Sequence, residues 1–365
     1  MKPILLVAAV LVSGCAMPAA SPQIAPQRAH RARPLTASGP QLYVAECCGV
    51  LNTGDVALYS PGDQQVQQRY INFAHFPAQI AVDATGTLYV RNLSNVGPGG
   101  VAITEWDRGA KQPSRRLGPF YWAAAFALDS TDEVYVANCN TCVYSSAHPR
   151  TSAPPDSITI YQAKGTQLLQ TITDGIYQPL SLAFDQQQNL YVFNGGYHRH
   201  PPSITVYAPG ASTPMLTITQ NIHQTGVLGL DPTGRLYVAD GQKRVLVFAP
   251  DSDQVLRTIT SGISSPQALQ FGRYNRLYVA NWPPSGDGWI SVYPPGSSSP
   301  KYEIKDSIKY PVAMAVDGSQ NLYVANLGDY GNSWVSVYEP SDGALIMTIK
   351  GGKYGPPRSL ALGTP

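Results

Sequence analysis

Short apolar runs separated by polar turns follow one another along most of the chain. The stretch from Ser181 to Asn194 shows the pattern: a short apolar run, four polar residues, then Leu190-Tyr191-Val192-Phe193 and a closing amide. Runs of this length, rich in β-branched and aromatic residues and bounded by turn residues, predict β-strands. Two further runs follow, Ser203 to Tyr207 and Met215 to Thr219, so the sequence predicts four strands in about 40 residues.

The same unit repeats through the chain. A Leu-Tyr-Val or Val-Tyr-Val element begins at Leu42, Leu88, Val134, Leu190, Leu236, Leu277 and Leu322. In six copies an Asp or Gly lies five residues before this element, at Asp83, Asp129, Asp185, Asp231, Gly272 and Asp317. A period of roughly 40 to 50 residues that carries four strands is typical of a β-propeller blade.

The two ends of the repeat region predict the number of blades. The first copy, at Leu42, has no apolar strand before it, and the last strand, Pro357 to Gly363, has no partner after it. Six complete strand pairs and this split pair predict seven blades. We expect the last strand to pair beside Leu42 to Ala45, which closes the ring and removes an exposed sheet edge. Residues 41–365 are thus predicted to be an all-β domain, a seven-bladed β-propeller of four-stranded blades.

The first 40 residues differ in composition from the repeats. Lys2 and an apolar run from Ile4 to Val12 predict a signal peptide over residues 1–15, since the run is too short to span a bilayer. Val12-Ser13-Gly14-Cys15 resembles a bacterial lipobox, which implies lipidation of Cys15; an ordinary secretory signal is the alternative. Residues 16–40, rich in Pro and Ala, predict a disordered tether. We expect an exported protein held by its lipid at the outer membrane or cell surface.

Charge limits the classes of partner. The chain has 25 Lys and Arg against 23 Asp and Glu, and only 13% of its residues are charged. Proteins that bind nucleic acid carry a basic patch for the phosphates, and this sequence shows none. We therefore expect no nucleic-acid partner. Separately, we expect the protein to be a monomer.

The repeat also resembles known families. Its pattern, Pro-x-x-apolar-x-apolar-Asp followed by Leu-Tyr-Val-Ala-Asn, is similar to that of NHL-repeat and streptogramin-lyase-like propellers, and more loosely to that of gluconolactonase-like propellers. The resemblance covers residues 41–365 and implies the fold, but such propellers include both enzymes and binding scaffolds.

A polar residue follows each Leu-Tyr-Val element by two positions. These residues are Glu46, Asn92, Asn138, Asn194, Asp240, Asn281 and Asn326. In propellers of the families named above, they would lie on the face that carries the loops between second and third strands. Two interpretations remain open: each side chain caps its own loop, or the ring binds a ligand, with the acids Glu46 and Asp240 meeting a cation or substrate.

Aromatic and histidine side chains occur in the loops expected on the same face. The loop after Asn194 contains Tyr197, His198 and His200, and the loops of the last two blades contain Trp282 and Tyr330. His198 and His200 alternate in sequence and are candidates for acid–base chemistry or metal binding, or are incidental to an exposed loop. Streptogramin lyases carry a Glu-x-His pair on this face, and this chain contains no Glu-x-His.

Four cysteines besides Cys15 follow Leu-Tyr-Val elements, at Cys47, Cys48, Cys139 and Cys142. An even number of cysteines in an exported chain predicts disulfides. Three connectivities are possible, of which Cys139–Cys142 is the simplest, and a thiolate metal site is the rival interpretation.

Two classes of function follow from these features. The first is a lipid-anchored module that binds a protein, glycan or small molecule through the loop face and needs no cofactor. The second is a metal-dependent lyase or lactonase-like hydrolase that uses Glu46, His198, His200 and Asp240 with a divalent cation. The sequence shows no recognisable spacing of catalytic residues, which favours the binding module.

Overall fold

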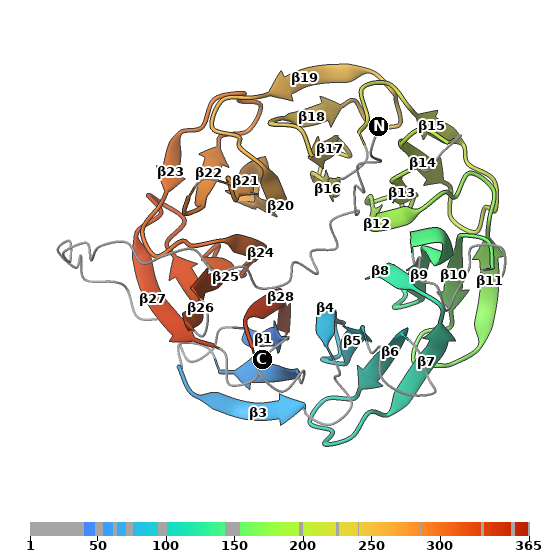
Figure 1. Ribbon diagram of the computed structural model, residues 1–365, viewed down its shortest axis with the longest axis horizontal. Helices are drawn as coiled ribbons and strands as arrows, with labels where there is room; N and C mark the ends of the chain where they lie inside the picture. The colour runs from blue at the N-terminus through green and yellow to red at the C-terminus, as the bar shows by residue number, and fades with distance from the viewer. Residues whose placement is uncertain are drawn as a thin grey trace, which may run out of the picture.

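Seven four-stranded antiparallel sheets surround a central axis in the computed structural model (Figure 1). It describes residues 40–47, 54–60, 64–70, 76–93, 101–142, 154–196, 200–223, 226–239, 241–284, 286–329, 332–351 and 355–363. The predicted fold class, an all-β seven-bladed propeller, is confirmed. Over these residues, no helix has the length and apolar character needed to cross a membrane.

Each blade is named here by its strands, from the innermost outward. Blade 1 contains β28 (Pro357–Gly363), β1 (Gln41–Glu46), β2 (Asp55–Tyr59) and β3 (Val66–Tyr70). Blade 2 contains β4 (Pro77–Val82), β5 (Leu88–Asn92), β6 (Val101–Trp106) and β7 (Arg115–Phe120). Blade 3 contains β8 (Ala123–Leu128), β9 (Val134–Asn138), β10 (Ser157–Tyr161) and β11 (Leu168–Ile172). Blade 4 contains β12 (Pro179–Phe184), β13 (Leu190–Asn194), β14 (Ser203–Tyr207) and β15 (Leu216–Ile218).

The remaining blades follow the same order. Blade 5 contains β16 (Val227–Leu230), β17 (Leu236–Ala239), β18 (Val245–Phe248) and β19 (Val255–Ile259). Blade 6 contains β20 (Pro266–Gly272), β21 (Arg276–Asn281), β22 (Trp289–Tyr293) and β23 (Tyr302–Ile304). Blade 7 contains β24 (Pro311–Val316), β25 (Leu322–Asp329), β26 (Asn332–Tyr338) and β27 (Leu345–Lys350). Two short 3-10 turns, η1 (Asn140–Cys142) and η3 (Arg273–Asn275), complete the described elements.

The C-terminal strand closes the ring, as predicted. β28 pairs antiparallel with β1, with Val44 opposite Leu360 and Ala45 opposite Ser359. Leu360, only 9% exposed, packs with Val44 and the blade 7 residue Val335. Ser359 Oγ also accepts a hydrogen bond from the N–H of Ile80 in blade 2 (3.2 Å). The last strand therefore joins blade 1 to both of its neighbours.

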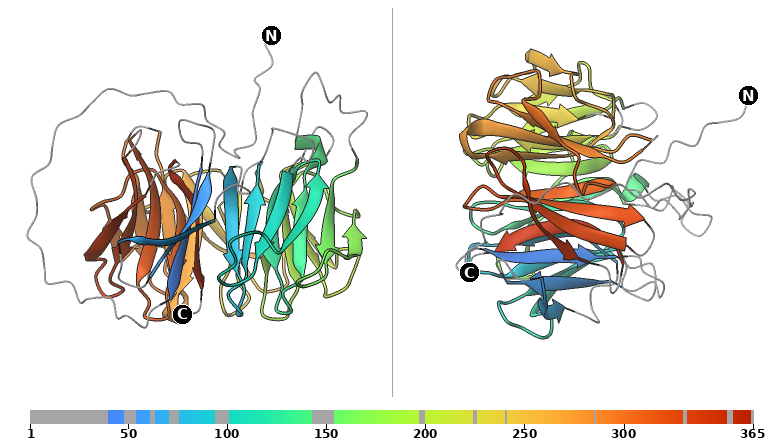
Figure 2. Two further views of the ribbon diagram at one scale, coloured as in Figure 1. Left: turned by 90° about the horizontal axis from the view of Figure 1, so that it is seen from below. Right: turned by 90° about the vertical axis from the view of Figure 1, so that its left-hand side faces the viewer.

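The two faces of the ring are built differently, as the edge-on views show (Figure 2). First strands run toward a face of tight turns, and second strands run back to the opposite face, which we call the loop face. In each tight turn that begins with Asp, the carboxylate accepts the N–H four residues ahead; the donors are Thr87, Glu133, Asn189, Arg235 and Asn321. This bond explains the fixed five-residue offset in the sequence.

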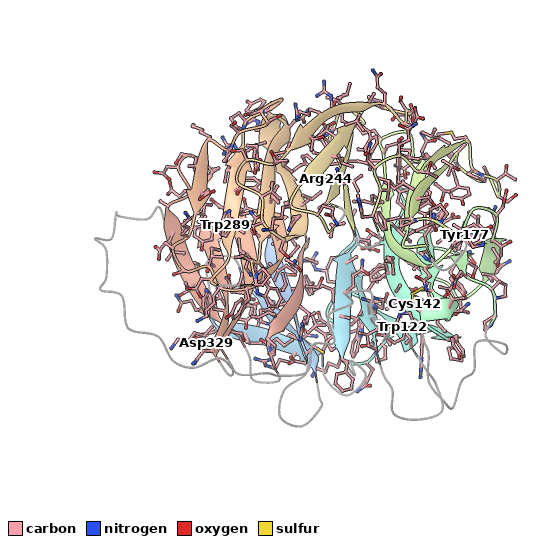
Figure 3. All side chains as sticks on the ribbon, turned by 45° about the horizontal axis from the view of Figure 1, so that its top comes forward. Trp122, Cys142, Tyr177, Arg244, Trp289 and Asp329 are labelled. Atoms are coloured by element: carbon pink, nitrogen blue, oxygen red, sulfur yellow. A yellow bond between two sulfur atoms is a disulfide. The ribbon has the colours of Figure 1, made fainter. Side chains whose placement is uncertain are left out.

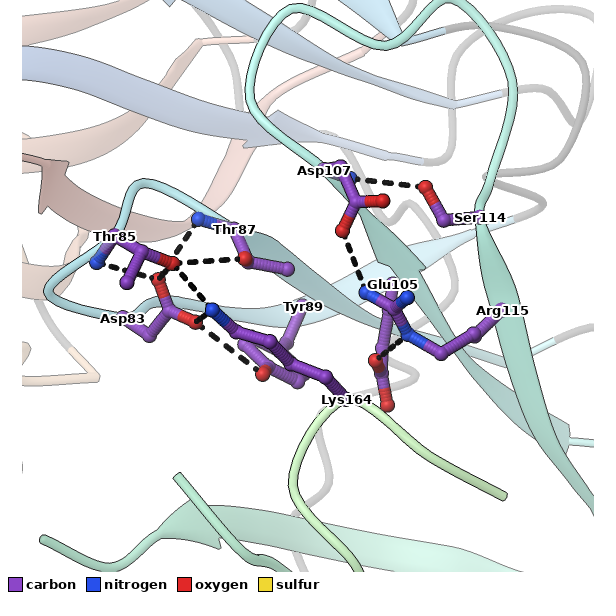
Figure 4. Close-up of polar contacts among 9 residues, drawn as sticks. All are labelled: Asp83, Thr85, Thr87, Tyr89, Glu105, Asp107, Ser114, Arg115 and Lys164. Atoms are coloured by element: carbon purple, nitrogen blue, oxygen red, sulfur yellow. Dashed lines mark hydrogen bonds and ion pairs between the residues drawn. The ribbon is translucent and has the colours of Figure 1, made fainter. Parts of the chain in front are cut away.

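The blade 2 turn shows the electrostatics of these contacts (Figure 4). Burial alone would raise the pKa of Asp83, but hydrogen bonds from Thr85 and Thr87 outweigh it and lower that pKa. Nearby, the buried Glu105 is paired with Arg115 (2.6 Å), which also contacts Asp107. Asp83 and Glu105 thus serve the fold.

Candidate functional site

The amides that follow the second strands are buried and hold the loops of the loop face. Asn194, Asn281 and Asn326 are each 0% exposed. Their Oδ1 atoms accept the backbone N–H groups of Tyr177 (3.1 Å), Ser264 (2.8 Å) and Lys309 (3.0 Å), two residues before the proline that opens the first strand of the same blade. Each amide therefore ties the end of one strand to the entry of its neighbour.

The amide nitrogens are also occupied. Those of Asn92, Asn138 and Asn194 donate to threonine hydroxyls on the third strand, and those of Asn281 and Asn326 to serines. This arrangement resembles the loop-capping interpretation of the sequence more than a ring of open ligand groups. The binding role predicted for these five residues stays a prediction.

Blade 1 replaces the amide with a buried ion cluster. Glu46 lies opposite Asp55 across β1 and β2, and both are 0% exposed. Arg69 on β3 contacts Asp55 (2.6 Å) and Glu46 (3.1 Å). One guanidinium thus faces two buried carboxylates. Burial raises the pKa of Asp55 to about 7, with the charge of Glu46 adding to the rise and Arg69 opposing it.

A pocket of about 310 Å³ opens between blades 3 and 4. Its lining comes from four separate segments: Thr141 in η1, Pro155 and Asp156 before β10, Thr173 to Gln178 between β11 and β12, and His200. Figure 3 shows two residues of this region, Cys142 and Tyr177, on one side of the ring and Asp329 across from them. The pocket brings together loops from two neighbouring blades.

Asp156 fixes the geometry of the pocket. Its carboxylate accepts the N–H (2.9 Å) and the hydroxyl (2.7 Å) of Thr141 and the N–H of Gln178 (2.8 Å). The side chain is largely buried, with 8% of the residue exposed. Because Thr141 belongs to blade 3 and Gln178 precedes the first strand of blade 4, one carboxylate joins the two walls.

Tyr177 and His200 form the accessible wall. Their rings stack at 3.6 Å between centroids with an interplanar angle of 11°. Tyr177 is 39% exposed, and His200 is exposed as well. Gly196, at a φ of 68°, lets the chain turn here, since a Cβ at this position would come within 2.5 Å of the His200 carbonyl oxygen. The stacked pair offers an aromatic surface with polar atoms at its edge.

The disulfide beside this pocket closes η1. Cys139 and Cys142 are bonded, with Cα atoms 5.3 Å apart, and Thr141 of the pocket lies inside the closed loop. Cys47 is also disulfide-bonded. The predicted disulfide residue Cys48 lies outside the described residues.

A second group of aromatic and charged residues joins blades 6 and 7. The Trp282 and Tyr310 rings lie 5.1 Å apart, and the Lys309 ammonium lies 5.8 Å from the Tyr310 centroid. Lys309 also pairs with Asp329 (2.7 Å) and Asp287 (3.5 Å). Trp282, a predicted binding residue, thus borders an ion-paired cluster.

Several predicted site residues lie outside the described residues. They are Cys15, Tyr197, His198, Asp240 and Tyr330. Of the four candidate catalytic residues, Glu46 and His200 are described, and they belong to blades 1 and 4, on well-separated parts of the ring. Within the described ranges, no three His, Cys, Asp or Glu side chains are grouped to hold a metal ion.

Asp156, Thr141 and Tyr177 were not singled out from the sequence. Asp156 lies in a loop without a repeat counterpart, and its partners are distant in sequence. Tyr177 could have been found from the sequence, because it stands two residues before the proline that opens a first strand. At this position its backbone N–H donates to the Oδ1 of Asn194.

Comparison with known proteins supports the fold. The chain matches no protein-family model and no curated protein. Among solved structures, it is similar to the periplasmic gluconolactonase PpgL of Pseudomonas aeruginosa, with a TM-score of 0.66 and 17% identity over 90% of this chain and 100% of that one. It is also similar to the computationally designed protein Ika8, with a TM-score of 0.59 and 12% identity over 87% and 88% of the two chains. The chain is a seven-bladed β-propeller, and at these identities the likeness extends to the fold alone.

Proposed function

We propose that the protein is an exported, lipid-anchored binding module that takes its ligand in the pocket between blades 3 and 4. Asp156 carries this proposal, because its three hydrogen bonds fix two loops from different blades around an open pocket. A pocket whose walls are already ordered loses less conformational freedom when it binds. The ligand would be a small molecule, a glycan or a protein segment that stacks on the Tyr177–His200 pair.

The location of the protein at a membrane is part of the same proposal. Residues 1–15 carry the signal and lipobox pattern, Cys15 would carry the lipid, and residues 16–40 would tether the propeller. The repeat pattern supports membership of the NHL-repeat and streptogramin-lyase-like propellers as well. Such a tether places the loop face within reach of partners near the membrane surface.

A ligand screen on the purified propeller tests the proposal. Sugars, sugar acids, aromatic acids and short peptides are scored by their effect on the melting temperature, and hits are titrated by calorimetry. We expect the variant Tyr177→Ala/His200→Ala to weaken hits at least tenfold. Tyr274→Ala is the control, since Tyr274 is 74% exposed in η3, on the face of tight turns. Hits that bind the pocket variant as tightly as wild type would overturn the assignment of the site.

The second candidate is a metal-dependent lactonase or lyase. The shared fold with a periplasmic gluconolactonase and the exposed His200 beside a pocket favour it. Against it, Glu46 is fully buried and paired with Arg69, which leaves it poorly placed as a cation ligand. Hydrolysis of a sugar lactone in the presence of added Ca²⁺ or Zn²⁺, abolished by His200→Ala, would favour this candidate over the binding module.

A further inference from the structure

Arg91 departs from the repeat at a buried position. The residue after Leu-Tyr-Val is alanine in five blades and phenylalanine in a sixth; these residues are Ala45, Ala137, Phe193, Ala239, Ala280 and Ala325. In blade 2 it is Arg91, which is 5% exposed. A methyl group satisfies the packing in most blades, so the fold itself does not require a guanidinium here.

The surroundings of Arg91 leave its charge without compensation. Its Nη1 donates to the carbonyl oxygen of Ala123, the first residue of β8 (2.9 Å), and its Nε is buried with no hydrogen-bond partner in the described residues. Glu105, the acid nearest in strand register, lies opposite Tyr89 and is paired with Arg115. A guanidinium has five N–H donors and stays charged in proteins.

Burial without a carboxylate costs free energy. Desolvation lowers the pKa of Arg91 to about 10, and no carboxylate contributes to that pKa. Removing a cation from water is expensive unless an anion and hydrogen bonds replace the lost hydration.

We propose that Arg91 is an anion-binding residue, which takes a carboxylate or phosphate group at the loop-face end of the interface between blades 2 and 3. The site is separate from the pocket between blades 3 and 4. The free edge of the guanidinium fits two oxygens of such a group side by side. Leu93 and Trp122 pack against the apolar cluster that contains Ala123, the residue bonded to Arg91; this keeps the polarity of the region low and strengthens the attraction.

The test compares anions at constant ionic strength on the whole propeller. Melting temperature and the NMR signal of the Arg91 Nε–H are followed in chloride buffer with added inorganic phosphate or acetate. We expect one or both anions to raise the melting temperature and shift that signal saturably. A response to phosphate alone indicates a phosphate-bearing ligand, and a response to acetate indicates a carboxylate.

Variants separate this site from a general salt effect. Arg91→Ala, which restores the residue of five other blades, should weaken the anion response at least tenfold and fold as well as wild type in chloride. Arg91→Lys keeps the positive charge but lacks the planar guanidinium group, so it should retain a weaker anion response. This variant tests the proposal if the alanine variant folds poorly. Arg235→Ala, at a partly exposed arginine paired with Asp231, should respond as wild type. No response in wild type, or an equal one in Arg91→Ala, would overturn the proposal.

Discussion

The variant Asp55→Asn should be more stable than wild type at high pH and about as stable as wild type at low pH. Two fully buried carboxylates, Asp55 and Glu46, share the single guanidinium of Arg69. Burial and the charge of Glu46 raise the pKa of Asp55 from 3.8 to about 7. Asp55 Oδ1 has no hydrogen-bond partner in the described residues, so it is free to carry the proton.

The sign follows from proton uptake. Because the folded pKa lies above the unfolded one, the folded chain binds more protons between pH 4 and pH 7. This contribution to the free energy of unfolding is complete below about pH 4 and is lost as the pH rises through about 7. About three pH units at roughly 1.4 kcal/mol each set an upper value near 4 kcal/mol, and we expect about 2–4 kcal/mol.

Asparagine resembles the protonated acid and cannot ionise, so Asp55→Asn should match wild type near pH 4 and exceed it by about 2–4 kcal/mol near pH 8. Urea unfolding at several pH values measures the difference. Glu46→Gln should flatten the wild-type slope, because Arg69 then serves Asp55 alone. The control Asp107→Asn removes an arginine-paired carboxylate that is 53% exposed and should show no such gain at pH 8. A pH-independent difference between Asp55→Asn and wild type would refute the argument.

Three further predictions concern closure, the disulfide and the anchor. Deleting residues 357–365 removes β28 and the packing of Leu360 and Leu362, and should lower the free energy of unfolding by at least about 3–6 kcal/mol. An unchanged urea midpoint together with a monomeric product would contradict ring closure. Leu256→Ala, at an exposed site, is the control. The double variant Cys139→Ser/Cys142→Ser should lower the free energy of unfolding by no more than about 2 kcal/mol, since the closed loop is short. It should also lower the affinity of any ligand of the pocket severalfold, as measured by calorimetry. Unchanged affinity without the disulfide would show that it does not order the pocket. Cys15→Ser should move the protein from the membrane fraction to the soluble fraction, and unchanged partitioning would rule out anchoring through Cys15.

The fold was predictable because its signals are local and repeated. The Asp-to-Leu offset reflects one carboxylate that binds an N–H four residues ahead, as at Asp83 and Thr87. The number of blades and the pairing of the last strand followed from counting these units. Each signal recurs several times, so a single irregular copy such as Gly272 did not obscure it.

The candidate pocket was less predictable because its contacts join distant segments. Asp156 meets Thr141 and Gln178 only because two blades are adjacent, and neither spacing appears in the repeat. The partner of Glu46 was hidden for a similar reason. Arg69 lies on an outer strand, where the sequence carries no motif, so a residue that looked like a free acid is in fact ion-paired.

A repeat protein supplies its own reference for each position, and this helps to separate structural from functional roles. Where most blades place asparagine, the buried amide ties two strands together, as Asn281 and Asn326 do. Blade 1 has Glu46 at this position, where it contacts Arg69 on the outer strand and shares it with the buried Asp55, and the pH dependence is the consequence. Arg91 differs in kind, because its hydrogen bond to Ala123 leaves most donors of the guanidinium unused. A substitution that buries a charge with a single hydrogen bond and no carboxylate partner is better explained by a ligand than by the fold.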